Sequence, residues 1–269
     1  MSVINFKSIK LTLDYLRHYI SAGDEHSVHS PFVFKLLTEG IYRKEREAAF
    51  DTIESIRKKL LNDQRTITIT DLGAGSTFDG IPQKRKVSEI ARNFAKSPGY
   101  SKLLFRLTQF FKPGSMIELG TSLGISAMYQ SAGNNNVSLY TLEGCPNTAS
   151  VAEEIFKENN FRNIKCIIGN FDETLPELLK KIEKADYVFI DGNHTYEATM
   201  RYFRLLKNYI HENSILIFDD INWSDGMKKA WSEIKSDPEV TITIDFFLVG
   251  LVFFSKNYTK QNFMLRING

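Results

Sequence analysis

The sequence predicts an α/β protein with a doubly wound, mostly parallel sheet that ends in an antiparallel strand. Between residues 115 and 219, apolar runs alternate with longer helical patterns, and the runs lie at 116–119, 137–142, 164–168, 187–190 and 215–218. Continuous apolar runs are typical of strands buried on both faces of a parallel sheet. Two later runs, 241–245 and 251–254, predict a terminal antiparallel pair, which brings the sheet to seven strands.

The first part of the chain is less regular and rich in residues that favour helices. Helices are predicted near 7–20, 31–42, 48–62 and 87–94. Ser30 and Pro31 suit the cap and first turn of the second helix. A basic stretch at 83–86 is either a mobile lid or a solvated loop. We therefore expect a mainly helical N-terminal extension over 1–112, which supplies a lid and an acceptor pocket, and a cofactor-binding domain over 113–269.

Composition gives little support for nucleic-acid or membrane binding. The 269 residues include 34 basic and 32 acidic side chains, a net charge of +2. The longest apolar stretch, 246–254, is too short to cross a bilayer, which takes about 20 helical residues. Cys145 and Cys166 form no CxxC pair, and no charged-then-apolar leader opens the sequence. A cytoplasmic protein is expected.

A glycine turn after the first parallel strand predicts a nucleotide-cofactor site. The strand ends in Glu118, and Gly120 and Gly124 then allow a tight turn and close backbone approach at the start of a helix. Glu143 ends the next strand about 20 residues later, where an acid is expected to bind ribose hydroxyls. A second motif with Gly73 lacks this context, and we interpret it as a structural turn.

Three acids follow the last two parallel strands, and the carboxyl ends of such strands share one edge of the sheet. Asp191 follows one strand, whereas Asp219 and Asp220 end the next. Clustered carboxylates favour a hard cation such as Mg²⁺, Mn²⁺ or Ca²⁺. His194 could accept a proton from a substrate hydroxyl, because its unperturbed pKa is about 6.5.

A structural interpretation of the same residues is also open. In it, Asp219 and Asp220 cap the next helix and pair with Lys228 or Lys229, and Asp191 caps a helix that begins near Thr195. A lone histidine such as His194 is often structural as well. Two adjacent acids at one strand end favour the metal interpretation, because a helix needs a single capping residue.

Taken together, residues 113–255 resemble the class I S-adenosylmethionine-dependent methyltransferases, which have a Rossmann-like fold. Within them the chain is similar to the metal-dependent O-methyltransferases related to catechol O-methyltransferase. The matching segments are 118–126, 143–146, 169–172, 191–196 and 219–220. Here an Asp-Asp pair replaces the usual Asp-Asn, and the run 191–196 is closer to relatives that methylate sugar hydroxyls. Segments 29–34, 103–106 and 219–224 also resemble a group of largely uncharacterised bacterial methyltransferase-like proteins.

The resemblance implies a role for particular residues. It implies S-adenosylmethionine contacts from Glu118, Gly120, Thr121, Ser122, Gly124, Ser126, Glu143, Gly144, Asn170, Phe171 and Asp191. It implies metal ligation by Asp191, Asp219 and Asp220. His194 falls where the catechol enzymes carry a catalytic lysine, so His194 and Asp191 are the predicted catalytic residues.

The expected activity is transfer of a methyl group from S-adenosylmethionine to a hydroxyl oxygen of a small molecule, with divalent-metal assistance. Two alternatives stay open: a metal-independent methyltransferase and a non-catalytic protein that binds the cofactor. An NAD-dependent dehydrogenase is disfavoured, because the loop at 120–124 lacks the G-x-G-x-x-G spacing. A small-molecule acceptor and a homodimer are the partners considered.

Overall fold

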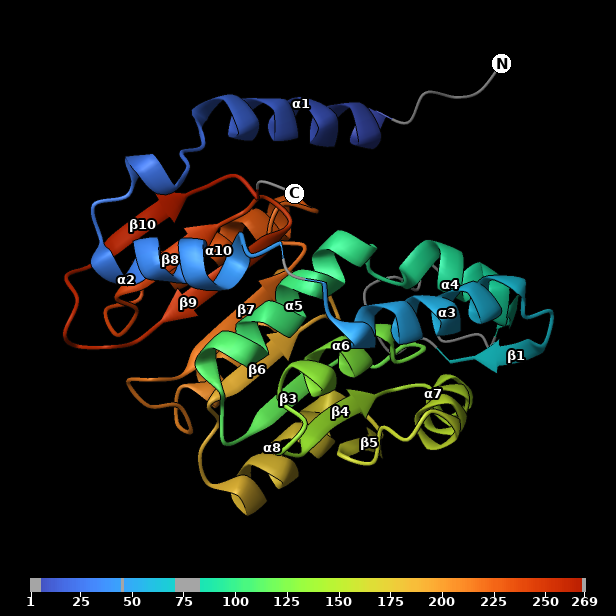
Figure 1. Cartoon of the computed structure of the whole chain (residues 1–269). Coiled ribbons are helices and arrows are strands. Elements are labelled where there is room, and N and C mark those ends of the chain that lie inside the picture. The colour runs from blue at the N-terminus through green and yellow to red at the C-terminus, as the bar shows by residue number, and fades with distance from the viewer. Residues whose placement is uncertain (1–5, 45, 71–82, 268–269) are drawn as a thin grey trace.

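The computed structural model describes residues 6–44, 46–70 and 83–267, so the predicted turn at Gly73 lies outside the described residues (Figure 1). Their centre is an eight-stranded sheet with the order β10-β8-β9-β7-β6-β3-β4-β5. Its strands are β3 (Met116–Leu119), β4 (Leu139–Glu143), β5 (Ile164–Ile168), β6 (Tyr187–Ile190), β7 (Ile215–Asp219), β8 (Ile242–Asp245), β9 (Val249–Phe253) and β10 (Gln261–Met264).

The strand directions confirm the predicted mostly parallel, doubly wound sheet. Strands β5, β4, β3, β6 and β7 pair in parallel, and β9 is antiparallel to both β7 and β8. The eighth strand, β10, pairs in parallel with β8 at the edge of the sheet and is not among the seven predicted. Its sequence, Gln-Asn-Phe-Met, is mostly exposed and lacks the apolar run that marks the other strands.

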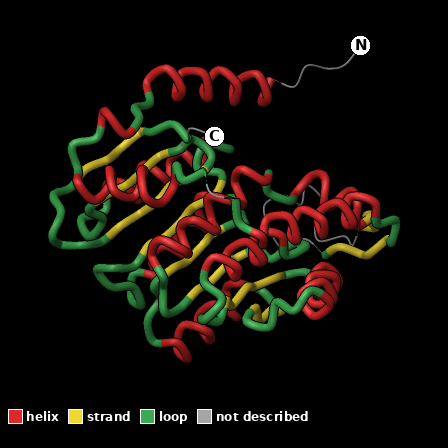
Figure 2. Tube along the Cα trace, viewed as in Figure 1, coloured by secondary structure: helices red, strands yellow, loops and turns green. Residues whose placement is uncertain are grey.

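Helices cover both faces of the sheet, as Figures 1 and 2 show. They are α1 (Phe6–Ser21), α2 (Pro31–Lys35), α3 (Ala48–Asn62), α4 (Val87–Phe94), α5 (Pro98–Phe111), α6 (Ile125–Gly133), α7 (Pro146–Glu158), α8 (Phe171–Ile182), α9 (Tyr196–Leu206) and α10 (Asp225–Ser236), with a 3₁₀ turn η1 (Glu25–Ser27) and a π-helical turn η2 (Leu36–Ile41). The helices predicted at 48–62 and 87–94 match α3 and α4. The one predicted at 31–42 divides into α2 and η2, and the Ser30 hydroxyl caps it as expected.

Alternation along each strand divides the buried side chains between two cores. Met116 faces a core shared with α2 to α7, whereas Ile117 and Leu119 face a core shared with α8, α9 and α10. A sheet covered on both faces leaves its edges and strand ends as the places where polar groups can gather. The division of the chain near residue 112 stays a prediction.

A small second sheet lies before the main one in the sequence. Strand β1 (Thr66–Ile69) pairs with β2 (Gln83–Lys86) in antiparallel register. The stretch interpreted above as a lid or a solvated loop is therefore a strand, and both interpretations were wrong. Its residues alternate between partly buried and exposed, and the guanidinium of Arg85 lies over the Phe94 ring.

Helix α1 lies along one side of the molecule, close to α10 and the end of β8 (Figure 1). Lys10 pairs with Asp225 at 2.9 Å, and His18 Nε2 lies 3.1 Å from Asp245 Oδ1. Within the described part of the chain, neither this helix nor any other combines the length and apolar character that a membrane crossing requires.

Candidate active site

The turn after β3 places two glycines where no other residue would fit. Gly120 has φ of +102°, and a Cβ there would lie 2.0 Å from the carbonyl oxygen of Asp191. Gly124 has φ of +79° and precedes α6, and its Cβ would lie 2.4 Å from the Phe156 ring. The backbone of this loop can therefore pack directly against the end of β6, which joins the glycine loop to the acidic end of the site.

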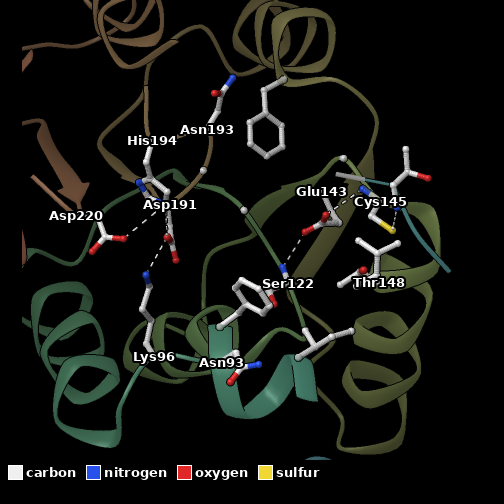
Figure 3. A pocket seen from close by; sticks show the side chains of 18 of the residues that line it. Asn93, Lys96, Ser122, Glu143, Cys145, Thr148, Asp191, Asn193, His194 and Asp220 are labelled. Carbon is white, nitrogen blue, oxygen red and sulfur yellow. Dashed lines mark hydrogen bonds and ion pairs between the residues drawn. The ribbon is translucent and has the colours of Figure 1, made fainter. Parts of the chain in front are cut away.

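Glu143 ends β4 and fixes the neighbouring loop. Its Oε2 accepts a hydrogen bond from the Ser122 backbone N–H at 2.8 Å, and its Oε1 accepts one from the Cys145 N–H at 2.9 Å (Figure 3). Each carboxylate oxygen can accept more than one hydrogen bond, so the group retains capacity for ligand hydroxyls. Ser122 holds a φ of +48°, which is uncommon outside glycine.

The start of α8 forms a third wall. Asn170 caps this helix by accepting a hydrogen bond from the Asp172 N–H at 3.0 Å. The ring of Phe171 lies against Gly192, since a Cβ at Gly192 would be 2.7 Å from that ring. Phe171 therefore packs against the residue that follows Asp191 at the end of β6, and both Asn170 and Phe171 line the same cavity.

These elements enclose a cavity of about 650 Å³, which is within the usual size range of small-molecule sites. The predicted cofactor residues that line it are Gly120, Ser122, Glu143, Gly144, Asn170, Phe171 and Asp191. Thr121, Gly124 and Ser126 do not line it, and neither does Glu118. For these four residues, cofactor contact stays a prediction.

Glu118 is fully buried beneath the loop. Its carboxylate accepts hydrogen bonds from Gln130 Nε2 at 2.7 Å and from Thr141 Oγ1 at 2.6 Å. Burial raises the pKa of Glu118 to about 7, against the hydrogen bonds that Ser126 and Thr141 supply. Glu118 thus lies in the core beneath the glycine loop and is held there by hydrogen bonds.

The opposite end of the cavity is acidic, and its side chains converge as Figure 3 shows. Asp191 Oδ1 lies 3.5 Å from His194 Nε2, which lies 3.9 Å from Asp220 Oδ2. Asp219 is almost fully buried behind them. Asp220 has φ of +53°, in the sparsely populated left-handed region.

Two residues that the sequence analysis missed complete this end. Lys96 Nζ lies 2.9 Å from Asp191 Oδ1 and also pairs with Asp219 Oδ2, while the Tyr100 hydroxyl donates to Asp219 Oδ1. Lys96 comes from the turn between α4 and α5 and Tyr100 from the first turn of α5, both far from the strand ends in sequence. Ser97 and Pro98 mark the start of a helix in this part of the sequence, but a helix start does not predict contact with β6 or β7.

Charge and burial oppose each other in this cluster. Burial disfavours the ammonium of Lys96, but the carboxylates of Asp191 and Asp219 outweigh burial and raise the pKa of Lys96. Burial likewise disfavours the imidazolium of His194, and the bond to Asp191 outweighs it, so the pKa of His194 is raised.

The pKa values of the three carboxyl groups are shifted in different directions. Burial acts against the ionised form of Asp191, yet Lys96 and His194 together hold the pKa of Asp191 well below its usual range. Burial and the negative charge of Asp191 raise the pKa of Asp219, and burial raises that of Asp220.

The capping interpretation of these acids was wrong. Thr195, not Asp191, caps α9, since its hydroxyl accepts from the Ala198 N–H. Ser224 caps α10, and Lys228 pairs with Asp14 of α1. The acids therefore have no role at the helix starts.

Two of the three predicted metal ligands, Asp191 and Asp219, belong to a group of side chains that could hold a cation. Ligand atoms of Asp191, His194 and Asp219 all lie within 4.8 Å of one another, so His194 stands in the group where Asp220 was expected. Whether Asp220 ligates a metal stays a prediction.

The N-terminal part of the chain closes the cavity on its remaining side. Residues before α5 that line it are Ile69, Thr70, Arg85, Ile90, Asn93, Phe94 and Lys96. From the other side Trp223, half exposed, contributes beside Ser224. The lining therefore combines both halves of the sequence.

Comparison with known proteins supports this reading of the fold. Residues 117–221 match the family model described as a methyltransferase domain. The O-methyltransferase from Bacillus cereus in complex with SAH has a TM-score of 0.55 at 15% identity, over 78% of this chain and 92% of that chain. The SAH-bound Podospora anserina methyltransferase PaMTH1 has a TM-score of 0.56 at 14% identity, over 95% of this chain and 100% of its own.

Two further proteins, one of known structure and one known by sequence, are also similar to this chain. The O-methyltransferase TomG from Streptomyces achromogenes, solved in complex with SAM and involved in tomaymycin synthesis, has a TM-score of 0.55 at 15% identity, over 83% of this chain and 95% of its own. The uncharacterized protein R132 of Acanthamoeba polyphaga mimivirus is 28% identical over an alignment of 137 positions, and this alignment covers 45% of this chain. That match spans 59% of the viral protein's length.

The domain match and the structural likeness agree with each other. Residues 117–221, which run from β3 to just past β7, match a methyltransferase domain, and the sheet that contains them has the fold of solved methyltransferases that bind SAH or SAM. In structure the chain is similar to O-methyltransferases.

Proposed function

We propose that this protein transfers the methyl group of S-adenosylmethionine to a hydroxyl oxygen of a small molecule. One observation carries the proposal: the Glu143 end and the Asp191 end line the same cavity, so a donor and an acceptor could lie side by side. Oxygen as the acceptor is favoured by the structural likeness to O-methyltransferases.

The cofactor end is assigned by the chemistry of its donors and acceptors. Glu143 would accept hydrogen bonds from the ribose hydroxyls, and the backbone from Gly120 to Ser122 would approach the methionine part. Asn170 and Phe171 would border the adenine, with the aromatic ring offering a flat apolar surface. When bound, S-adenosylmethionine supplies an electrophilic methyl group on a positively charged sulfur.

The acceptor end would manage a single proton. As the acceptor oxygen forms its bond to the methyl carbon, the carbon–sulfur bond breaks and its electron pair stays on sulfur. His194 accepts the hydroxyl proton, and Asp191 at 3.5 Å orients and stabilises the resulting imidazolium. Positioning by the cavity walls supplies much of the rate, because donor and acceptor must be collinear.

A divalent cation fits the same end. Asp191 and Asp219 offer oxygen ligands beside His194, and Asp220 lies next to them, a set that suits Mg²⁺, Mn²⁺ or Ca²⁺. A bound ion would lower the pKa of the acceptor hydroxyl. His194 Nε2 faces these acids, so if Nε2 binds the ion, Nδ1 is the nitrogen left to accept the proton.

The metal-independent alternative is favoured by one observation of its own. The ammonium of Lys96 already bridges Asp191 and Asp219, so this end holds a positive charge without an ion. In that case Lys96 would help to balance the carboxylates while His194 takes the proton. A cytoplasmic location, a small-molecule partner and a homodimer remain further proposals, the first consistent with two free cysteines.

The test is transfer of labelled methyl. Purified protein would be incubated with methyl-labelled S-adenosylmethionine and a panel of sugars, phenols and polyols, in Mg²⁺ or in excess chelator. Label in a hydroxyl acceptor supports the proposal, and equal rates in chelator select the metal-independent form. Label in amine acceptors alone would contradict the oxygen assignment, and no transfer to any acceptor by a cofactor-bound protein would favour the non-catalytic alternative.

A further inference from the structure

Lys96 reaches the acidic end from a backbone that is fixed in place. It lies in the short turn between α4 and α5, where the Ser97 hydroxyl caps α5. Its carbonyl oxygen accepts a hydrogen bond from Arg57 Nη1 of α3 at 2.6 Å. Arg57 is itself buried and held by Glu54 at 3.0 Å. The position of Lys96 is therefore set by the packing of α3 against the turn.

The side chain is enclosed as well as anchored. Only 18% of the Lys96 side chain is exposed, and Nζ lies 5.5 Å from the centre of the Tyr100 ring. A long, flexible lysine loses rotamer entropy when held in this way, so its fixed position needs compensating contacts. The two carboxylates provide them.

The ammonium engages two carboxylate groups that a cation would also use. Lys96 pairs with Asp191 and with Asp219, and these two acids supply two of the three atoms in the candidate metal group. The third, from His194, shares Asp191 Oδ1 with Lys96. A carboxylate oxygen engaged by an ammonium is a poorer ligand, because an entering ion must first break that pair.

We propose that Lys96 and a divalent ion are alternative occupants of the Asp191–Asp219 carboxylate pair, so that Lys96 sets how tightly this protein binds divalent metal. The inference rests on the proposed function only for locating the acceptor end. Lys96 is a positioning residue here: it acts on the carboxylates and not on the reacting atoms. The N-terminal part of the chain would thereby control the metal dependence of a site built by the sheet.

Metal affinity tests this directly and without turnover. Free Mn²⁺ would be followed by electron paramagnetic resonance as it is titrated into the full chain, its Lys96→Met variant and a Lys102→Met control. Lys102 lies on α5 with its Nζ over the Phe50 ring, so it undergoes the same chemical change away from the acids. Removing a cation from two buried carboxylates should tighten Mn²⁺ binding about tenfold or more.

Further variants make the result specific. Lys96→Arg should keep the affinity of the unaltered protein, and Asp219→Asn combined with Lys96→Met should abolish the gain. If Lys96→Met folds poorly, Lys96→Gln is titrated in its place, and Mn²⁺ should raise the melting temperature of either variant more than that of the unaltered chain. Unchanged or weaker Mn²⁺ binding in the folded Lys96 variants, or an equal gain in Lys102→Met, would overturn the inference.

The outcome is separate from that of the methyl-transfer assay. A protein that methylates nothing could still show the Mn²⁺ gain, which would leave this inference standing and remove the proposed function. Normal methyl transfer with unchanged Mn²⁺ affinity in Lys96→Met would leave the proposed function standing and overturn the inference about Lys96.

Discussion

The Glu143 carboxylate accepts a hydrogen bond from the Ser122 backbone N–H at 2.8 Å, and this contact joins the end of β4 to the glycine loop after β3. One acid thus shapes the loop and faces the cavity. The cofactor end is preorganised by it, because the loop does not need to rearrange to present its backbone to a ligand.

Glu143→Ala should weaken S-adenosylmethionine binding about tenfold to a hundredfold. The variant loses the charged acceptor to which a ribose hydroxyl would donate, and one such hydrogen bond is worth about 1.5–3 kcal/mol. Calorimetry measures the affinity, and Glu158→Gln, an exposed change on α7, is the control. Unaltered affinity in Glu143→Ala would show that this acid does not bind the cofactor.

Asp219→Asn should remove divalent-dependent turnover while leaving cofactor affinity close to normal. The substitution keeps the shape of a side chain that is 2% exposed but places an amide against the Lys96 ammonium. Initial rates with and without Mg²⁺, together with calorimetry, separate the two effects. A variant that methylates normally in Mg²⁺ would show that the metal mechanism is wrong.

His194→Gln should lower kcat by about 10²–10⁴-fold, the usual range for a lost general base. Because the Asp191 contact raises the pKa of His194 above 6.5, the neutral form that accepts a proton is populated only at higher pH. The kcat of the unaltered protein should therefore fall as pH drops, with a midpoint above that ordinary value. A pH–rate profile measures this, and an acid limb that persists in His194→Gln would assign it to another group.

Glu118→Gln should stabilise the protein at alkaline pH. The pKa of Glu118 is about 7 in the fold against an ordinary 4.5, so between these values the folded state keeps a proton that the unfolded chain has lost. The free energy of unfolding then falls as pH rises through this window, by up to about 3 kcal/mol. The glutamine carries no such charge, and its amide could donate to Gln130 Oε1, which has no partner among the described residues.

Urea unfolding at pH 5 and pH 8 measures the change. The difference in free energy of unfolding between Glu118→Gln and the unaltered protein should grow toward pH 8 and should exceed that of the exposed control Glu158→Gln. A difference that is the same at both pH values would mean that burial does not raise the pKa of Glu118 in the folded protein.

The central sheet could be predicted because its strands are short apolar runs between longer helical patterns. Strands β2 and β10 escaped prediction for the opposite reason, since Gln83–Lys86 and Gln261–Met264 have little apolar character and are recognisable only from their partners. The strand propensity of the residues and the period of their apolar positions predict little where pairing with a neighbouring strand decides the structure.

The site divides in the same way. Glu143, Asp191 and His194 stand at strand ends, where the topology of a parallel sheet brings side chains together, so their proximity could be predicted. Lys96 reaches the same cluster from the turn between α4 and α5, and Tyr100 reaches it from the start of α5; no local pattern records that packing. Tertiary contact alone reveals them.

The most direct measurement is a calorimetric titration of the purified protein with S-adenosylmethionine, with NAD as the control and with Mg²⁺ present or removed by chelator. We predict about micromolar affinity for S-adenosylmethionine, none for NAD, and affinity about tenfold to a hundredfold weaker in Glu143→Ala. Absence of S-adenosylmethionine binding under both metal conditions, by a protein shown to be folded, would contradict the assignment of the cavity as a methyl-donor site.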